Sequence, residues 1–285
     1  MNRIKFLSVV TVYSCLFVPL LHSTNCFSNE AAVTSESTKT TKKDSHLNPL
    51  DVANEQYKQG LKYAEYGLYD EAIEMYKKSL ALEPNNTDAY KNMGNAYLQQ
   101  EKYDEAIEAL RKVIERKPED YDACYTLGTA YFDKGIYDKA IENFKKTLQI
   151  NPEHKATYFL LGIAYAKVGK YDDAVKMLKK RIEFDPNLAI AYSNLGIVYS
   201  MKGSDKEAFA EFKKALDIDP NHENALYNLA LLYDKTGNLD EAIQYYTKTV
   251  EVNVSNSDAQ YRLGKNYTKK KQYDDAINAF QTAVM

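Results

Sequence analysis

Pairs of adjacent carboxylates recur along the chain, and two carboxylates held close together could act as a general acid and a general base. Asp70–Glu71 and Asp104–Glu105 are two such pairs, and each precedes Ala-Ile. Because similar acidic segments return at a fixed spacing, they belong to a repeated element rather than to one site. Each pair would lie in the first turn of a helix, where negative charge stabilises the helix dipole. We therefore interpret these carboxylates as solvated helix starts and predict no catalytic activity.

Cysteine and histidine residues are too few and too scattered for a metal site or a disulfide framework. The three cysteines are Cys15, Cys26 and Cys124, and the four histidines are His22, His46, His154 and His222. The last two histidines occupy the same place in two different copies of a repeat, so they cannot share a metal ion. All 11 glycines lie at two positions of that repeat, which leaves none for a phosphate-binding loop. The sequence therefore predicts neither a cofactor nor a metal.

The balance of charged residues limits the kind of partner. The formal net charge is −3 over 285 residues, and acidic and basic side chains are interspersed along the chain. A nucleic-acid-binding domain would instead gather Lys and Arg on one face or along one helix. We predict that the chain does not bind nucleic acid.

From Ala53 to the last residue, the chain repeats every 34 residues without an insertion or a deletion. With Ala53 as repeat position 1, position 11 is tyrosine and position 20 is alanine in all seven copies. Position 8 is glycine in every copy except the sixth, which has Ala230. Position 32 is proline in the first five copies. A fixed period of this size predicts a stack of small repeated units rather than a globular domain.

Each repeat has the pattern of two helices that approach each other closely. Positions 4, 7, 8 and 11 share one face of a first helix. Glycine inside a helix costs about 1 kcal/mol relative to alanine, so its recurrence at position 8 indicates a notch for the second helix. That second helix begins near position 18 and carries a bulky residue at position 24, such as Phe144 or Leu178. Glycine at position 15 permits the turn between the helices, and proline at position 32 ends the second helix.

This pattern resembles the tetratricopeptide repeat family, as in the segments TDAYKNMGNAYLQQEKYDEAIEALRKVIERKP and NALYNLALLYDKTGNLDEAIQYYTKTVEV. The resemblance covers residues 53–285 and implies an all-α fold, an α-solenoid of antiparallel helix pairs stacked into a right-handed superhelix. It also implies that the first helices line a concave groove. The seven expected repeats span residues 53–86, 87–120, 121–154, 155–188, 189–222, 223–256 and an incomplete 257–285.

The N-terminal residues 1–24 are predicted to be a secretory signal peptide. A basic start, MNRIK, precedes an apolar run of about 16 residues, and small residues suited to cleavage follow. This order predicts export to the periplasm or the exterior. The alternative is an uncleaved or lipidated segment that would attach the chain to a membrane. Residues 25–52 are polar and rich in Ser, Thr and Lys, so we expect a disordered linker there.

A second face of the first helix is the candidate functional surface, and the family resemblance places it on the groove. It comprises repeat positions 2, 5, 9 and 12, with 6 and 13 beside them. Along the array this face is mixed polar in the early repeats, apolar in the middle repeats and polar or basic in the last repeats. The residues predicted to bind a partner are Tyr125, Phe159, Ile163, Asn194, Ile197, Met201, Tyr227, Asn228, Arg262 and Lys265. An apolar centre with polar or basic ends suits an extended peptide or an amphipathic helix.

Two binding modes known in the family fit this chain only in part. One grips the C-terminal carboxylate of a chaperone with residues from three successive repeats. Lys91 and Asn95 match its first part, but the later positions hold Thr126, Ala156 and Leu160. The other mode is a ladder of asparagines at position 6. Asn92, Asn194 and Asn228 match it, and it is interrupted by Lys58, Thr126, Leu160 and Arg262.

We therefore interpret the chain as a non-catalytic scaffold that binds a protein or peptide partner in its groove. Two alternatives stay open. The repeats could recruit substrates for a larger enzyme, for example a glycosyltransferase, or the chain could be a self-assembling structural protein. The final repeat leaves Ile277, Phe280 and Val284 on a helix that no further repeat covers. Exposed apolar ends of repeat arrays associate, so we expect self-association through this end.

Overall fold

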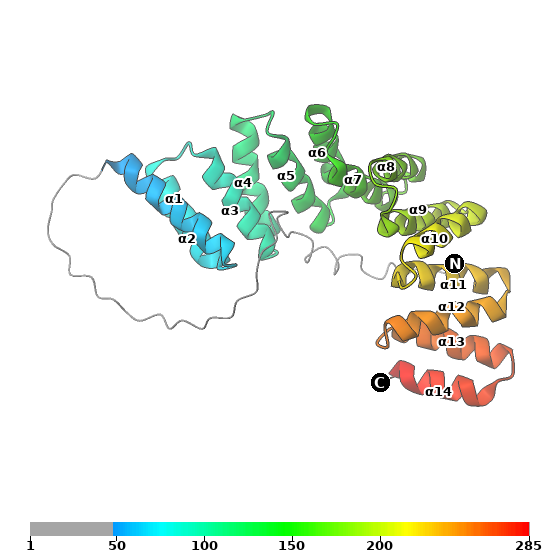
Figure 1. Ribbon diagram of the computed structural model, residues 1–285. Coiled ribbons are helices and arrows are strands. Elements are labelled where there is room, and N and C mark those ends of the chain that lie inside the picture. The colour runs from blue at the N-terminus through cyan, green and yellow to red at the C-terminus, as the bar shows by residue number, and fades with distance from the viewer. Residues whose placement is uncertain (1–47, 285) are drawn as a thin grey trace. The chain divides into compact units, whose positions relative to one another are not determined.

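The computed structural model describes residues 48–284, which form fourteen α-helices in succession (Figure 1). The predicted signal peptide and most of the predicted linker lie outside the described residues, as does Met285. Consecutive helices pair side by side, which confirms the predicted all-α solenoid of antiparallel helix pairs. The helices are α1 (Pro49–Glu65), α2 (Tyr69–Leu82), α3 (Thr87–Gln99), α4 (Tyr103–Arg116), α5 (Tyr121–Asp133), α6 (Tyr137–Ile150), α7 (Lys155–Lys167), α8 (Tyr171–Phe184), α9 (Ala189–Lys202), α10 (Asp205–Ile218), α11 (Glu223–Thr236), α12 (Leu239–Val252), α13 (Ser257–Lys269) and α14 (Tyr273–Val284).

The helices divide into two compact units. The first unit ends at Pro118 and holds α1–α4, and the second begins at Glu119 and holds α5–α14. Every residue predicted to bind a partner lies in the second unit. Across residues 48–284, no helix has the length and apolar character needed to span a membrane.

The start of α1 corrects one boundary of the sequence analysis. Residues 49–52 of the expected linker are helical, because the side chain of Asn48 accepts a hydrogen bond from the backbone N–H of Leu50 at 3.2 Å. Proline suits the first turn of a helix, where its missing N–H is not needed, so Pro49 fits this start.

The glycine at repeat position 8 has the packing role that its recurrence predicts. A Cβ added at Gly162 would lie 2.8 Å from Cγ of Leu178, and one added at Gly128 would lie 2.6 Å from a ring carbon of Phe144. Leu178 and Phe144 both occupy repeat position 24, which lies in the second helix, and both are 0 % exposed. A fully buried side chain cannot move aside, so the absence of a side chain at position 8 sets how closely the two helices pack.

In all seven repeats, the residue at position 15, in the turn after the first helix, has a left-handed backbone conformation with positive φ. Five of these residues are glycines, such as Gly169 with φ of 78°. Glu101 and Lys271 take the same place in the second and seventh repeats, with φ of 57° and 61°. In every repeat the N–H of the next residue then donates to the carbonyl of the position 11 tyrosine, at 2.8–2.9 Å. This bond closes the end of the first helix, as a Schellman-type cap does.

Position 34, just before each first helix, supplies a capping side chain in most repeats. Asn86, Asp120 and Asn256 accept hydrogen bonds from the backbone N–H three residues later, at 2.9–3.0 Å. His222 does the same through Nδ1, which accepts from the N–H of Ala225 at 3.3 Å. Such caps satisfy backbone donors that the helix itself leaves unpaired. The two histidines of the repeats are thus placed at helix starts.

The acidic residues near position 18 lie where the sequence analysis expects them, in the first turn of each second helix. Several also pair with a lysine of the following repeat. Asp172 binds Lys202, and Asp240 binds Lys270. These carboxylates therefore stabilise helix starts and join neighbouring repeats.

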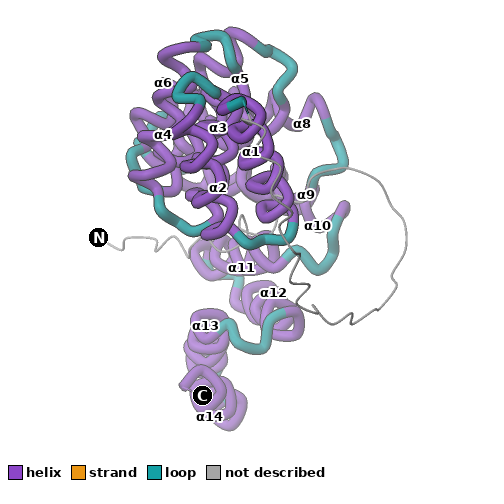
Figure 2. The backbone as a smooth tube through the Cα atoms, turned by 90° about the vertical axis from the view of Figure 1, so that its left-hand side faces the viewer, coloured by secondary structure: helices purple, strands orange, loops and turns teal. Residues whose placement is uncertain are grey.

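Within each unit, the first helices form the more tightly packed layer. Successive first helices touch each other, α1 with α3 and then α5 with α7, α7 with α9 and α9 with α11. Neighbouring second helices have no comparable contact within the described residues. Short loops join all these helices (Figure 2). The first helices, which carry the candidate surface, are therefore the more closely spaced set within each unit.

Candidate functional site

The ten residues predicted to bind a partner, here called the inner stripe, lie on five successive first helices. Helix α5 carries one of them, α7 two, α9 three, α11 two and α13 two. The stripe thus crosses the second unit from its first helix pair to its last. Their exposure and hydrogen bonds differ strongly along the stripe.

The apolar end of the inner stripe is buried. Phe159 and Ile163 are each 5 % exposed and Tyr125 is 9 % exposed. Burial raises the pKa of Tyr125 to about 12. Helix α7 also buries Leu160 and Leu161, so it is covered on nearly all sides. These residues therefore leave little side-chain surface for a partner to contact.

The middle of the inner stripe is partly exposed. Ile197 and Met201 on α9 keep part of their side chains accessible. Ile197 also packs against the buried cluster that includes Phe212 of α10 and Leu229 of α11. Apolar side chains that pack against the core on one side and stay accessible on the other lose little side-chain entropy when they contact a partner.

Two asparagines at position 6 have the same geometry in consecutive repeats. Nδ2 of Asn194 donates to the carbonyl oxygen of Ile190 at 2.8 Å, and Nδ2 of Asn228 donates to that of Asn224 at 2.7 Å. Each bond reaches back one turn within the same helix and so fixes the amide. A side-chain amide has a second N–H and a carbonyl oxygen beyond this one bond.

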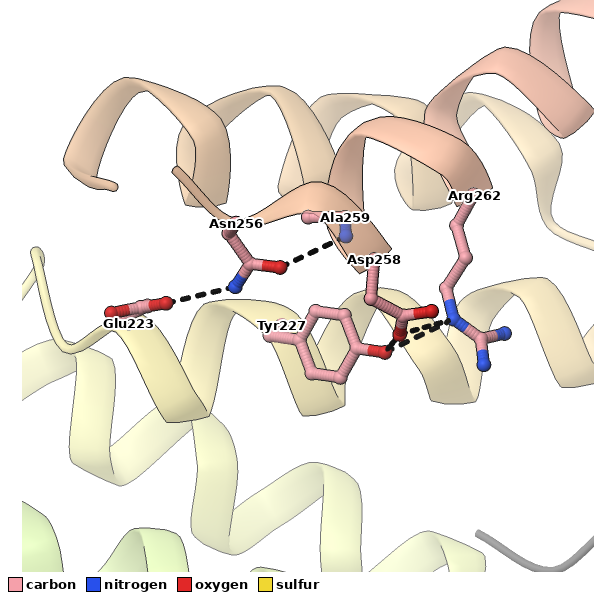
Figure 3. A network of polar contacts seen from close by, with 6 residues as sticks. All are labelled: Glu223, Tyr227, Asn256, Asp258, Ala259 and Arg262. Carbon is pink, nitrogen blue, oxygen red and sulfur yellow. Dashed lines mark hydrogen bonds and ion pairs between the residues drawn. The ribbon is translucent and has the colours of Figure 1, made fainter. Parts of the chain in front are cut away.

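A polar network joins α11 to α13 at the other end of the stripe (Figure 3). The hydroxyl of Tyr227 donates to the carboxylate of Asp258, and Nε of Arg262 donates to both, at 3.0 Å each. Burial acts to lower the pKa of Arg262, but Asp258 together with Tyr246 outweighs it, so the pKa stands above its ordinary value. In Figure 3 the two terminal nitrogens of Arg262 point away from this network.

Sequence reasoning missed this network, although its signal is in the repeat. Tyr227 is at position 5 and Arg262 is at position 6 of the next repeat. The first unit has the same contact, because Nδ2 of Asn92 donates to the hydroxyl of Tyr57 at 2.9 Å and these residues occupy the same two positions. A tyrosine at position 5 followed by a donor at position 6 of the next repeat predicts this cross-helix bond.

A second network connects the starts of α11 and α13. The carboxylate of Glu223 accepts from the side-chain amides of Asn253 and Asn256, at 2.8 Å each. Asn256 in turn caps α13 by accepting from the N–H of Ala259 at 2.9 Å (Figure 3). These bonds hold α13 against α11 and so position Arg262.

Lys265, the last residue of the inner stripe, is exposed. Its ammonium lies 5.8 Å from the ring centroid of Tyr261, which is itself 51 % exposed. A lysine above a tyrosine ring gains about 0.5–1 kcal/mol of cation–π attraction at such a surface site. This end of the stripe therefore presents an aromatic ring and positive charge to solvent.

Groups able to do covalent or metal chemistry are not assembled on this surface. Residues 48–284 contain no group of His, Cys, Asp and Glu side chains that could hold a metal ion. Cys124 is fully buried on α5, and burial raises the pKa of its thiol. Nδ1 of His154 lies 2.6 Å from Oγ1 of Thr157 at the start of α7.

Comparison with known families finds repeat models along most of the described chain. Tetratricopeptide repeat models match residues 63–127, 168–203, 189–222, 211–244 and 258–284. A model described as anaphase-promoting complex, cyclosome, subunit 3 matches residues 110–181. None of these models describes a catalytic domain. No match was found among curated protein sequences.

Solved structures give the same fold. A crystal structure of MamA protein is 30% identical, covers 60% of this chain and 93% of that chain, and has a TM-score of 0.58. YrrB, described as a TPR protein with an unusual peptide-binding site, is 23% identical over 65% of this chain and 95% of that chain, with a TM-score of 0.55. A tetratricopeptide repeat protein from Parabacteroides merdae is 20% identical over 81% of this chain and 92% of that chain, with a TM-score of 0.68.

Proposed function

Because the chain belongs to the tetratricopeptide repeat family, we propose that it is a non-catalytic scaffold that binds a segment of a partner protein. Repeats of this family typically mediate protein–protein interactions, and the YrrB structure is described as having a peptide-binding site. The observation that carries the proposal is the order of side chains on α9, α11 and α13. Partly exposed apolar groups come first, then fixed amides, then cations.

The apolar contacts of the partner would be made on α9. Ile197 and Met201 are partly exposed there, whereas Phe159 and Ile163 are buried and would shape the surface from below. This arrangement moves the centre of the proposed site toward the C-terminal repeats relative to the sequence analysis. Well-packed apolar anchors usually carry most of the binding free energy of an interface.

The amides and cations would set the direction of the bound segment. Asn194 and Asn228 each retain hydrogen-bonding groups that can pair with a peptide backbone. Arg262 and Lys265 on α13 would meet acidic side chains of the partner. The partner segment would therefore have its apolar residues over α9 and its acidic residues over α13.

The test is a titration of a partner, identified by crosslinking in the native compartment, against matched variants. We expect Met201→Ala to weaken binding by about tenfold or more, because an anchor of this kind is worth roughly 2 kcal/mol. Lys265→Ala is expected to act mainly through the salt dependence of binding. The control is Lys176→Ala on α8, whose side chain is exposed. Equal loss of affinity in the control would refute the proposed surface.

Two other variants, Phe159→Ala and Lys179→Ala, are less suitable in this titration. Phe159→Ala would remove a buried side chain and lower the stability of the fold, so its effect on binding could not be separated from unfolding. Lys179 lies with its ammonium 5.8 Å from the ring centroid of Tyr199 on α9, so it is not independent of the surface.

The proposed scaffold acts after export. The support is the succession of basic, apolar and small residues in residues 1–24, which lie outside the described residues. N-terminal sequencing of the protein isolated from its compartment should find a new start between residues 23 and 28. A mature chain that still begins at Met1 would instead favour attachment to a membrane through this segment.

A further inference from the structure

Arg262 is fixed through one edge of its guanidinium. Nε donates to the hydroxyl of Tyr227 on α11 and to Oδ2 of Asp258 on α13, at 3.0 Å each. The two terminal nitrogens point away from these partners (Figure 3). A guanidinium carries five N–H donors in one rigid plane, and its two terminal nitrogens together match the two oxygens of a carboxylate.

The first unit shows that an arginine is not needed to join two neighbouring first helices at this place. Asn92 occupies the same repeat position as Arg262, and its Nδ2 donates to the hydroxyl of Tyr57 at 2.9 Å. Tyr57 corresponds in turn to Tyr227. A neutral amide thus makes the same cross-helix bond. What the arginine adds is a positive charge and a planar pair of donors.

The network prepares Arg262 for a ligand. A mobile arginine side chain loses rotamer freedom when it binds, and that loss lowers the affinity of the complex. Here Tyr227 and Asp258 already restrict the side chain before any partner arrives. The side chain of Arg262 is still 35 % exposed, so a partner can reach it.

The charges around Arg262 favour a ligand with a single negative charge. Asp258 forms an ion pair with Arg262, so the two side chains together carry no net charge. A phosphate group would bring between one and two negative charges close to Asp258. A carboxylate brings only one, and its planar shape fits the two terminal nitrogens of an arginine.

We infer that Arg262 binds one carboxylate side chain, an aspartate or glutamate of the bound segment, and that Tyr227 and Asp258 are the positioning residues that orient it. The inference rests on the proposed function, because the same segment would contact α9. It adds that recognition at α13 depends on the planar geometry of arginine as well as on its charge. Lysine at this position would keep the charge without a planar pair of donors.

The probe is a library of peptides about twelve residues long, displayed on phage and selected for binding to the full 285-residue chain. The tightest binder is then synthesised with an acetylated N-terminus and an amidated C-terminus, which removes both terminal charges. We expect it to contain an aspartate or glutamate whose change to the corresponding amide weakens binding by about tenfold, as loss of a charged hydrogen-bonded pair does.

Arg262→Asn is the matched variant, because asparagine makes the cross-helix bond in the first unit. In this variant, changing the acidic residue of the peptide to its amide should alter affinity by less than about twofold, since the paired group is gone. Arg262→Lys should also lose most of the tenfold effect, whereas Lys265→Ala should keep it. A tenfold effect that persists in Arg262→Asn, or that disappears in Lys265→Ala, would refute the site.

Asp258→Ala separates positioning from net charge. By Coulomb attraction alone, removing this negative charge should strengthen the binding of an acidic peptide. If Asp258 positions Arg262, the variant should instead bind the peptide about threefold or more weakly, and Tyr227→Phe should change affinity in the same direction. Stronger binding by Asp258→Ala would overturn the positioning role. Thermal unfolding of each variant checks that the fold is kept.

The outcomes also distinguish this inference from the proposed function. If Met201→Ala weakens peptide binding but Arg262→Asn does not change the effect of the acidic residue, the inference fails and the proposed function stands. A selected peptide that binds only with a free C-terminal carboxylate, or more tightly with phosphoserine in place of the acidic residue, would overturn the side-chain carboxylate as the ligand. A library that yields no binding peptide would contradict both.

Discussion

A single missing side chain at Gly162 sets the distance between α7 and α8. A Cβ at this position would lie 2.8 Å from Cγ of Leu178 and 3.4 Å from the carbonyl oxygen of Ala174. The first of these neighbours is fully buried, and the second belongs to the backbone of α8. Because neither can give way freely, the residue at repeat position 8 limits how closely these two helices can pack.

We predict that Gly162→Val lowers the free energy of unfolding by roughly 1–3 kcal/mol or more, because it overpacks this contact. The measurement is denaturant unfolding of the variant beside Lys176→Ala, whose side chain is exposed on α8. The control should stay within about 0.5 kcal/mol of the parent. Lys167 would be a poorer control, since its partly buried side chain has a lowered pKa. Equal midpoints would contradict the assigned packing.

At the start of α11, the cap made by His222 should make stability depend on pH. Nδ1 accepts the N–H of Ala225, so the ring must be neutral at that nitrogen, and burial lowers the pKa of His222 below its ordinary 6.5. As pH falls, His222 is therefore protonated at a higher pH in the unfolded chain than in the folded chain. The stabilising contribution is complete above pH 6.5 and is lost as pH falls through the folded-state pKa.

Thermal unfolding between pH 7.5 and 5 should show this loss, and His222→Asn should reduce it, because asparagine caps a helix without titrating in this range. His154 behaves in the same direction, since burial also lowers its pKa. The double variant with His154→Asn should therefore have the flatter profile. An unchanged pH dependence in the double variant would exclude the two histidines as its source.

At the scale of the helix pair, the turn at repeat position 15 uses one backbone conformation with two kinds of residue. Glycine adopts positive φ without steric cost, whereas glutamate and lysine pay about 1–2 kcal/mol for it. Glu101 and Lys271 are therefore the strained members of the set, with φ of 57° and 61°. The turn persists there because its hydrogen bonds to the first helix are the same as in the other repeats.

We predict that Glu101→Gly stabilises the first unit by about 0.5–1 kcal/mol. Relief of the left-handed strain outweighs the greater freedom that glycine gives the unfolded chain. The reverse change, Gly169→Ala, should destabilise by about 1 kcal/mol, although no atom lies within 4 Å of the added Cβ. Unfolding of both variants by urea measures the two effects, and a destabilised Glu101→Gly would show that the side chain has another role.

At the scale of each unit, stability is shared between neighbouring repeats, because each described repeat packs mainly against those beside it in its own unit. The cover that a side chain receives therefore depends on its place in the array as well as on its place in the repeat. Ile243 and Ile277 occupy the same repeat position, but only the first is packed against a following helix.

We predict that Ile243→Ala lowers the free energy of unfolding by roughly 2 kcal/mol, at the lower end of values for buried isoleucine because it is only partly buried. Ile277→Ala should cost less than about 0.5 kcal/mol when measured at a dilution where the chain is monomeric. Similar losses at the two positions would mean that α14 is covered within the single chain.

The sequence by itself determines the repeat, the helix pairs and the turns. These follow from local patterns that recur: a position 8 glycine facing a bulky position 24, as in Gly128 and Phe144, and a position 15 residue that can turn the chain. Each pattern acts within about 20 residues, and seven copies in phase remove chance matches. The all-α solenoid and the role of the glycines are confirmed for this reason.

Only the tertiary structure decides which side of each first helix a partner could reach. Helical periodicity places Phe159 and Ile197 on the same stripe, yet the first is 5 % exposed and the second keeps an accessible face. Helical periodicity also cannot show that Arg262 donates hydrogen bonds to Tyr227 and Asp258. Burial and hydrogen bonding across repeats depend on the side chains and spacing of two neighbouring helices, and a single helix's pattern contains neither.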